Sequence, residues 1–326
     1  MSEFAYKVNG FIPSPVDPRD YRLTYGVSGA EPLPEEWEPD IHGFQIHDQG
    51  TINSCVAHAI TGQYEMHGFP KMAYGYIYGD RQHTEHQGEG MILRDALKSL
   101  QKDGVPTLES YPYNAEVQEI IDIFKAQAPT AAEEAARFKI KAYYRLYSVE
   151  ECKRAKMEGK AVLYGLFLFD GMIDIGAGTD PMVIPPKLQN NMTLPSIIGG
   201  HAVGSGGWCQ KGLKFPNSWS ERWGDKGYGY IDPKCFVWSQ EYGFPIPLVE
   251  AWAVEFDDGT EPAEPQKTGW YQQDGKWRYS KDGKDVTGWL LDRGTWYYLD
   301  PDGFMAADAW RFIDGCWYYL TSSGAM

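Results

Sequence analysis

Cys55 is the residue whose surroundings best suit chemistry. A cysteine attacks a carbonyl carbon only as its thiolate, which forms at neutral pH beside an imidazolium or at the N-terminus of a helix. Within DQGTINSCVAHAIT, Gly50, Asn53 and Ser54 predict a turn and a helix N-cap before an apolar helical run, which places Cys55 in the first helical turn. Because a lone cysteine is more often a small buried apolar residue, its role depends on the residues that accompany it.

Three residues accompany Cys55 in the chain order Gln49, Cys55, His201, Asn217. The segment QGTINSCVAHA resembles the nucleophile region of papain-like cysteine peptidases, IIGGHAVGSGGW resembles their histidine strand, and FPNSWSERWGDKGYGYI resembles their asparagine loop. The resemblance covers most of residues 36–256, and the spacing within each block agrees.

The resemblance implies a role for each matching position. Cys55 attacks the scissile carbonyl to form a thioester, and His201 takes the thiol proton and later gives it to the leaving amine. Asn217 accepts a hydrogen bond from the other ring nitrogen of His201, and Trp219 covers that bond from water. Gln49 joins the backbone N–H of Cys55 in an oxyanion hole.

A second segment, HQGEGMILRDAL, resembles the glycine-containing stretch that pairs with an extended substrate in bacterial members of the family. Gly88 or Gly90 would let the substrate backbone approach closely, although two glycines in a loop also fit a simple turn. Ile52 and Val56 stand where many relatives have cysteine and tryptophan, so the extracellular type of disulfide is not expected. Residues 1–35 resemble a short bacterial lead and are too brief for a long inhibitory propeptide.

No metal or other cofactor is expected. Residues 83–86 (HTEH) and the pair His42 and His47 contain metal-binding side chains, but the sequence places no third ligand beside them.

The chain divides into an N-terminal arm (1–35), a peptidase domain (36–257), a linker (258–267) and three repeats (268–326). The linker interrupts the apolar pattern with acidic residues, glycine and proline. Helical spacing occurs at 54–67, 91–103 and 114–127, whereas a helix after Ser148 and then apolar, β-prone runs follow Lys141. The predicted class is α+β: a two-lobed papain-like fold, with a helical lobe and an antiparallel β-barrel lobe, followed by a small β-hairpin solenoid.

The last 59 residues hold six of the 12 tryptophans, more than so small a core can bury, so some rings should face a ligand. The repeats GTWYYLD..GFM and GCWYYL..SGAM resemble choline-binding and related cell-wall-binding repeats of Gram-positive bacteria and their phages. The resemblance implies aromatic cages for a quaternary ammonium. A structural ladder, a dimerisation surface and a carbohydrate site stay open as alternatives. The two cages implied are Trp270, Trp277 and Tyr298, and then Trp289, Trp296 and Tyr319.

The net charge of -15 argues against nucleic acid or an anionic membrane surface as the main partner, because phosphate binding needs clustered cations. No apolar stretch of about 18 residues predicts membrane insertion, and the first residues lack a signal-peptide pattern. The expected partners are a peptide or peptidoglycan-peptide substrate and choline-bearing teichoic acid or another wall glycopolymer. The expected site of action is the bacterial wall or outside the cell, after a cytoplasmic stage that ends at lysis.

The resulting hypothesis is a cysteine endopeptidase held on a Gram-positive wall, of the kind found in phage lysins (endolysins) or wall hydrolases. Two alternatives remain at this point: a surface or secreted protease that acts on proteins while attached to the wall, and a wall-binding protein with an inactive peptidase fold.

Overall fold

The computed structural model describes two compact units. The first unit consists of Met1–Ser14 and Tyr25–Asp258, and the second consists of Pro15–Thr24 and Gly259–Met326. The predicted linker at 258–267 lies outside the described residues. The structure describes residues 9–15, 17, 20–23, 32–40, 43–81, 89–112, 117–169, 181–188, 196–243, 247–257, 269–273, 275–281, 284–292 and 294–326.

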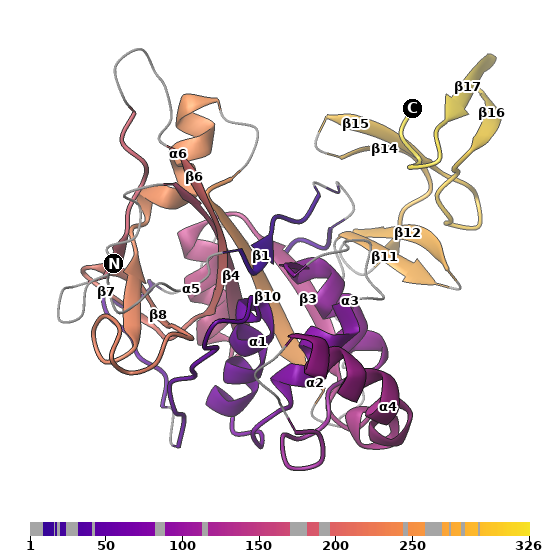
Figure 1. Ribbon diagram of the computed structural model, residues 1–326. Coiled ribbons are helices and arrows are strands. Elements are labelled where there is room, and N and C mark those ends of the chain that lie inside the picture. The colour runs from indigo at the N-terminus through magenta and orange to yellow at the C-terminus, as the bar shows by residue number, and fades with distance from the viewer. Residues whose placement is uncertain are drawn as a thin grey trace. The chain divides into compact units, whose positions relative to one another are not determined.

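Helices occupy the early part of the first unit, as the helical spacing predicted (Figure 1). The helices predicted at 54–67 and 91–103 are α1 and α3, and the one predicted at 114–127 is α4, which continues through Pro129 to Ala135. These helices are α1 (Cys55–Met66), α2 (Tyr74–Asp80), α3 (Leu93–Lys102) and α4 (Val117–Ala135).

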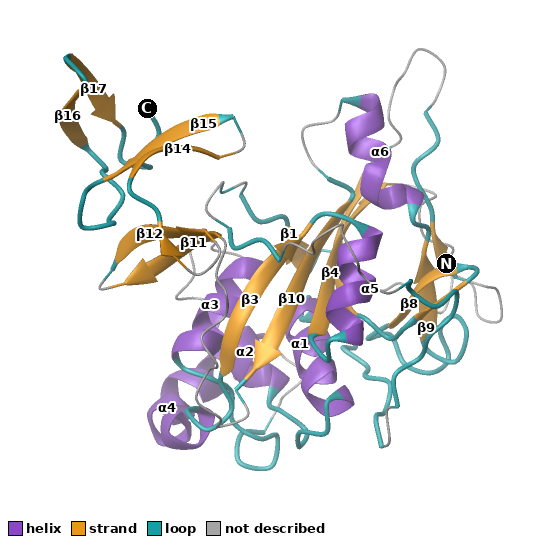
Figure 2. Cartoon of the chain, turned by 180° about the vertical axis from the view of Figure 1, so that it is seen from behind, coloured by secondary structure: helices purple, strands orange, loops and turns teal. Residues whose placement is uncertain are grey.

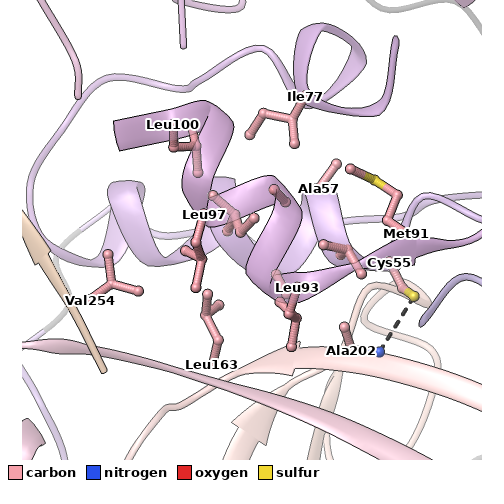
Figure 3. Packing of buried hydrophobic residues seen from close by; sticks show 14 of the residues in the cluster. Cys55, Ala57, Ile77, Met91, Leu93, Leu97, Leu100, Leu163, Ala202 and Val254 are labelled. Carbon is pink, nitrogen blue, oxygen red and sulfur yellow. Dashed lines mark hydrogen bonds between the residues drawn. The ribbon is translucent and has the colours of Figure 1, made fainter. Parts of the chain in front are cut away.

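Helix α1 is the centre of the first unit. All of its residues except Glu65 are buried, including the polar His58, Thr61 and Gln63, so the helix is surrounded by other elements. Figure 3 shows α1 packed against Leu97 of α3 and Leu163 of the neighbouring sheet, with Cys55 at the edge of this cluster. Each buried leucine contributes roughly 1.5–3 kcal/mol to stability, and together they fix the position of the thiol.

An antiparallel sheet supports this helix. Its strand order is β3-β10-β4-β6; α1 and α3 lie on one face and α5 on the other (Figures 1 and 2). The Ser148 side chain caps α5 by accepting a hydrogen bond from the N–H of Glu151. The elements are β3 (Ile140–Leu146), α5 (Val149–Met157), β4 (Ala161–Phe169), β6 (Ile197–Gly204) and β10 (Val249–Phe256).

A second sheet, of order β5-β9-β8-β7, completes the strand-rich part. Residues 217–219 follow β8 directly, so this sheet carries the predicted asparagine loop. Helices followed by strands confirm the predicted α+β class. The elements are β5 (Met182–Val183), β7 (Trp208–Cys209), β8 (Gly212–Pro216), β9 (Tyr228–Ile231) and α6 (Lys234–Tyr242).

The N-terminal arm adds one short strand to the first unit. Strand β1 (Phe11–Ile12) pairs in parallel with β2 (Met91–Ile92), and Asn9 forms a bridge to Gly200 of β6. The arm therefore spans from the segment before α3 to the strand that carries His201.

The second unit contains three β-hairpins, which confirms the hairpin character predicted for the repeats. The third hairpin turns through Asp314 (φ 49°) and Gly315 (φ 85°), the two positive φ angles that a type I′ turn requires. Gly275 and Gly294 take the same position in the other two turns, with φ of 75° and 82°. The strands are β11 (Gly269–Gln273) with β12 (Lys276–Lys281) and the short β13 (Lys284–Asp285), β14 (Gly288–Asp292) with β15 (Thr295–Leu299), and β16 (Ala309–Ile313) with β17 (Cys316–Leu320).

Successive hairpins stack through aromatic rings. Side chains alternate between the two faces of each hairpin, and we call the face that carries the two tryptophans the Trp face. Tyr297, on the opposite face of the second hairpin, packs on Trp270 of the first with ring centroids 4.8 Å apart. Tyr318 packs on Trp289 in the same way at 4.9 Å. The Trp faces of the first and second hairpins are thus covered in part by the hairpin that follows.

No helix among the described residues is long and apolar enough to cross a membrane.

Candidate active site and repeat sites

Helix α1 begins at Cys55, as the sequence predicted. Ser54 occupies the N-cap position but its side chain makes no capping hydrogen bond, so backbone geometry alone defines the helix start. The Sγ of Cys55 accepts a hydrogen bond from the backbone N–H of Ala202 at 3.4 Å (Figure 3). The thiol therefore lies beside the residue that follows His201 in β6.

His201 is held by Asn217 in the geometry a general base needs. The Nε2 of His201 lies 2.7 Å from the Oδ1 of Asn217, and the same oxygen accepts the backbone N–H of Ser218 at 2.8 Å. An amide oxygen can only accept, so Nε2 carries the proton and Nδ1 has the lone pair. That Nδ1 makes no hydrogen bond within the described part of the chain. The unprotonated nitrogen of His201 therefore has no hydrogen-bond donor bound to it in the described structure, and Ala202, the next residue of β6, contacts the Cys55 thiol.

Trp219 shields this pair. Its ring is fully buried, with its centroid 4.5 Å from that of His201 and an interplanar angle of 34°. Excluding water strengthens the hydrogen bond between His201 and Asn217, because the local dielectric is low.

Gln49 is buried beside the same loop. Its Nε2 donates to the carbonyl of Ile52 at 2.7 Å, and its Oε1 accepts the hydroxyl of Ser218 at 2.6 Å. The amide nitrogen has two hydrogens, so one remains for an oxyanion near the start of α1. Sequence reasoning missed Ser218, although its position between Asn217 and Trp219 in the predicted loop was a usable signal.

The backbone of Gly10 lies directly on the thiol of Cys55. A Cβ at Gly10 would stand 2.6 Å from the Sγ of Cys55 and 2.6 Å from the carbonyl oxygen of Asn53. Only glycine fits so close a contact. Cys55 and His201 are both completely buried in consequence.

The arm around Gly10 takes the path of an extended peptide. The N–H of Met91 donates to the carbonyl of Gly10 at 2.9 Å, and a Cβ at Gly90 would stand 2.9 Å from the carbonyl oxygen of Asn9. On the other side, a Cβ at Gly200 would stand 2.2 Å from the carbonyl oxygen of Phe11. Gly90 thus faces an extended backbone, while Gly88 lies outside the described residues. Neither the residue types nor the spacing of the sequence indicated that the arm itself fills this place.

Burial keeps both reactive groups neutral while the arm is in place. Loss of water raises the pKa of the Cys55 thiol to about 12, although hydrogen bonds from the backbone of Ala202 and Val56 oppose that rise. Loss of water also lowers the pKa of His201 to about 4, against the hydrogen bond to Asn217. A thiolate and an imidazolium need water or a polar group around them, so the covered pair is uncharged.

No cluster of three or more metal-binding side chains occurs among the described residues. The Nδ1 atoms of His47 and His58 lie 3.2 Å apart, and Nε2 of His47 lies 3.0 Å from Glu65. His42 and residues 83–86 lie outside the described residues.

In the first hairpin, Trp270 is a core residue. It is 2% exposed, packs on Tyr279 and Tyr297, and donates its Nε1 hydrogen to Asp292 at 3.1 Å. Trp277 is half-buried. Tyr298, the third residue implied for this cage, pairs instead with Trp289 of its own hairpin, with ring centroids 5.2 Å apart.

In the second hairpin, the rings of Trp289 and Trp296 lie 6.1 Å apart, and Tyr318 adds a third ring 4.9 Å from Trp289. Trp296 is 41% exposed, so this group has an open side. Tyr319 lies on the Trp face of the third hairpin, 5.3 Å from Trp310. The structure therefore brings Tyr318, rather than Tyr319, to Trp289. The two adjacent tyrosines lie on opposite faces of the third hairpin, and the repeat alignment alone did not show which of them contacts the second hairpin.

Comparison with known proteins separates the two units in the same way. The choline-binding repeat family matches residues 267–310, and a cell wall binding repeat family matches residues 308–326. An uncharacterized peptidase C1-like protein of Acanthamoeba polyphaga mimivirus is 28% identical over an alignment 204 positions long, which covers 56% of this chain. The chain spans 62% of the length of that curated relative.

Solved structures of cysteine proteases share the fold of the first unit. Xylellain, a cysteine protease from Xylella fastidiosa, is 23% identical with a TM-score of 0.61, covering 78% of this chain and 98% of xylellain. A procathepsin B from Trypanosoma congolense is 15% identical with a TM-score of 0.54, covering 76% of this chain and 86% of that one.

Proposed function

We propose that this chain, which combines the papain-like fold with C-terminal choline-binding repeats, is a cysteine endopeptidase that works on a choline-bearing cell wall. One observation carries the catalytic part. His201 has its Nε2 fixed by Asn217 at 2.7 Å, its Nδ1 open, and the Cys55 thiol hydrogen-bonded to the next residue. A thiol with an oriented base is the minimal apparatus for acyl transfer.

Each residue has one part in the proposed reaction. His201 Nδ1 takes the thiol proton, and the Cys55 sulfur adds to the carbonyl carbon of the substrate. The second amide hydrogen of Gln49 and the backbone N–H of Cys55 stabilise the negative oxygen. The peptide C–N bond then breaks as His201 protonates the amine. Water, deprotonated by His201, hydrolyses the thioester and restores the thiol.

The substrate must replace the arm and take a similar path. An extended peptide fits between Gly90 and Gly200, where the arm's backbone now lies. The ring of Phe11 rests on Gly165, where a Cβ would stand 2.2 Å from its Cζ. The missing side chain at Gly165 leaves room for a large apolar group, which supports an apolar residue in the substrate at this subsite.

The repeats supply the proposed attachment to the wall. Trp289, Trp296 and Tyr318 form a three-ring group with one exposed side, and aromatic faces attract a quaternary ammonium by roughly 0.5–2 kcal/mol for each contact. Several such sites on one chain gain from the many choline groups of a teichoic acid.

Wall attachment favours peptides of the peptidoglycan as the substrate, which is the action of a phage-type lysin or wall hydrolase. The competing function is proteolysis of wall-associated proteins by the same site. It is favoured by the likeness to xylellain, which is described as a cysteine protease.

Parallel digestion distinguishes the two. Purified choline-bearing walls and casein are incubated with the protein and with its Cys55→Ala variant, and new amino termini are counted. Release of wall peptides by the wild type alone supports the wall hydrolase, and cleavage of casein alone supports the protease. If neither substrate is cut after the arm has been displaced by mutation, the proposed activity is wrong.

A further inference from the structure

The N-terminal arm belongs to both units of the protein. Met1–Ser14 is part of the first unit and Pro15–Thr24 is part of the second. Only six residues separate Ser14 from Tyr21, the arm residue that contacts the first repeat. The arm is therefore a short covalent connection between the residues that cover Cys55 and the residue that contacts the first hairpin. Release of one end from its contacts changes how firmly the other end is held.

A buried carboxylate anchors the arm at the cleft. The N–H and hydroxyl of Ser14 donate to the two oxygens of Glu250 at 2.8 and 2.5 Å. Glu250 is 2% exposed and also receives Arg145 at 3.1 Å and the indole N–H of Trp252 at 2.7 Å. Hydrogen bonds to a buried charge are stronger than neutral ones, so Ser14 is a specific latch for the segment that covers Cys55. Glu250, a charge within the apolar run VEAWAVEF, was the sequence signal for this latch.

A tyrosine anchors the arm at the repeats. The backbone N–H of Gln272 donates to the hydroxyl of Tyr21 at 3.1 Å, and the ring of Tyr21 lies 6.4 Å from that of Trp277. Burial raises the pKa of Tyr21 to about 12, so the phenol stays neutral. Both contacts belong to the second unit.

Trp277 is less exposed than its counterparts in the other two hairpins, because it lies beside Tyr21 and also packs against the cluster that contains Trp270. Trp296 and Trp317, which occupy the place of Trp277 in the second and third hairpins, are 41% and 65% exposed. Trp277, beside Tyr21, is half-buried. A cation that approached the face of Trp277 would need the space that Tyr21 now takes, because cation–π attraction requires a distance within about 6 Å of the ring centroid. Tyr21 and such a ligand therefore compete.

We propose that a quaternary ammonium ligand of the wall, bound at Trp277, displaces Tyr21 and thereby releases residues 9–14 from Cys55. The inference rests on the proposed function. Two anchors on one short segment hold it far more tightly than either anchor alone. While one anchor is bound, the other arm residue stays at a high effective concentration near its own binding site. Loss of the Tyr21 anchor leaves the arm held only by its contacts in the cleft, which are the Ser14 hydrogen bonds, the β1–β2 pairing and buried Phe11, and a peptide substrate then competes for this place. The wall polymer is in this way both the attachment and the activator.

Alkylation of Cys55 tests the coupling without any substrate. The full-length protein is treated with iodoacetamide, and modification of Cys55 is followed by mass spectrometry with Cys209, a half-buried thiol of the same unit, as the internal reference. We expect choline chloride to accelerate labelling of Cys55 at least tenfold while Cys209 is unchanged, and ethanolamine to have little effect. Tyr21→Ala should label fast without choline and no longer respond to it, whereas Tyr242→Ala, an exposed tyrosine of α6, should behave like the wild type.

Ser14→Ala and Glu250→Gln weaken the latch alone, so they should label faster than the wild type and still respond to choline. If they label fast but choline does not change the wild type, the arm blocks the site without coupling and the proposal is wrong. It is also wrong if wild-type Cys55 already labels as fast as Cys209 without choline. If labelling follows choline but no variant cleaves walls or casein, the coupling stands and the proposed peptidase activity fails.

Discussion

The hydroxyl of Ser218 holds the oxygen of the Gln49 side chain at 2.6 Å, and this one contact decides which way the amide faces. Because the oxygen is fixed by Ser218, the amide nitrogen must point toward Ile52 and the start of α1. The amide nitrogen that we propose as the oxyanion donor is thus oriented by Ser218.

Loss of this contact should weaken catalysis without weakening substrate binding. For Ser218→Ala we expect kcat to fall by roughly tenfold with KM little changed, because one hydrogen bond of about 1–1.5 kcal/mol no longer orients the donor. Gln49→Ala should cost more, about 100-fold, since the donor itself is gone. Ser220→Ala, in the same loop, is the control. Equal losses at Ser218 and Ser220 in steady-state kinetics would point to a general loop defect instead.

Within the described part of the chain, Asn217→Ala removes the one hydrogen bond that the imidazole of His201 makes. We expect kcat/KM to fall by about 10- to 100-fold, a milder effect than that of Cys55→Ala, because Asn217 orients the base and does not react. Retention on choline-agarose should be unchanged in both variants. A loss as complete as that of Cys55→Ala would contradict a purely orienting role.

Gly10→Ala should expel the arm from the cleft. The new Cβ would stand 2.6 Å from the Sγ of Cys55, and overpacking of this kind costs about 1–3 kcal/mol. Iodoacetamide labelling of Cys55 should accelerate by roughly tenfold or more while labelling of Cys209 stays constant. Unchanged labelling of Cys55 would mean that the arm does not limit access to the thiol.

Acid should also favour displacement of the arm. The pKa of His201 is about 4 under the arm and its ordinary value is 6.5, so between these pH values only the uncovered imidazole binds a proton. The state that binds more protons gains stability as pH falls, and here that is the uncovered state. An NMR titration of the His201 ring should give a pKa near 4 in the wild type and a value closer to 6.5 in Gly10→Ala. The same low pKa in both proteins would disprove the link with covering.

The adjacent residues Tyr318 and Tyr319 separate two versions of the second aromatic cage. If the ligand lies between Trp289, Trp296 and Tyr318, Tyr318→Ala should weaken choline binding by roughly 3- to 30-fold, and Tyr319→Ala should have a smaller effect. Calorimetry with choline measures both. A larger loss for Tyr319→Ala would restore the cage that the repeat alignment implies.

The juxtaposition of Cys55, His201, Asn217 and Gln49, which we propose as the catalytic residues, follows from contiguous sequence blocks with fixed local spacing. Cys55 at a helix start and Asn217 in a loop after a strand depend mainly on neighbours in the chain. Ser14 and Glu250 lie 236 residues apart, and no local pattern could join them before the fold was known. The contact of Gly10 with Cys55 was equally unpredictable, because the sequence around a glycine near the N-terminus does not indicate which distant residue it contacts.

The tyrosines of the repeats illustrate a different limit. A shift of one residue along a strand moves a side chain to the other face. The alignment of the repeats therefore located the hairpins correctly but assigned Tyr298 and Tyr319 to the preceding hairpins, where the structure places Tyr297 and Tyr318. Only the cross-strand register, with Trp289 opposite Tyr298 and Trp310 opposite Tyr319, settles the faces.

The two hairpin junctions have nearly the same geometry, with Trp270 and Tyr297 at 4.8 Å and Trp289 and Tyr318 at 4.9 Å. A junction that repeats itself can be copied without redesign of its surroundings. Duplication of one hairpin of about 20 residues would insert a further junction and a further ligand group, and deletion would remove one. The number of repeats, and with it any avidity that they confer, can therefore change by one hairpin at a time. The sequence of the first unit stays the same.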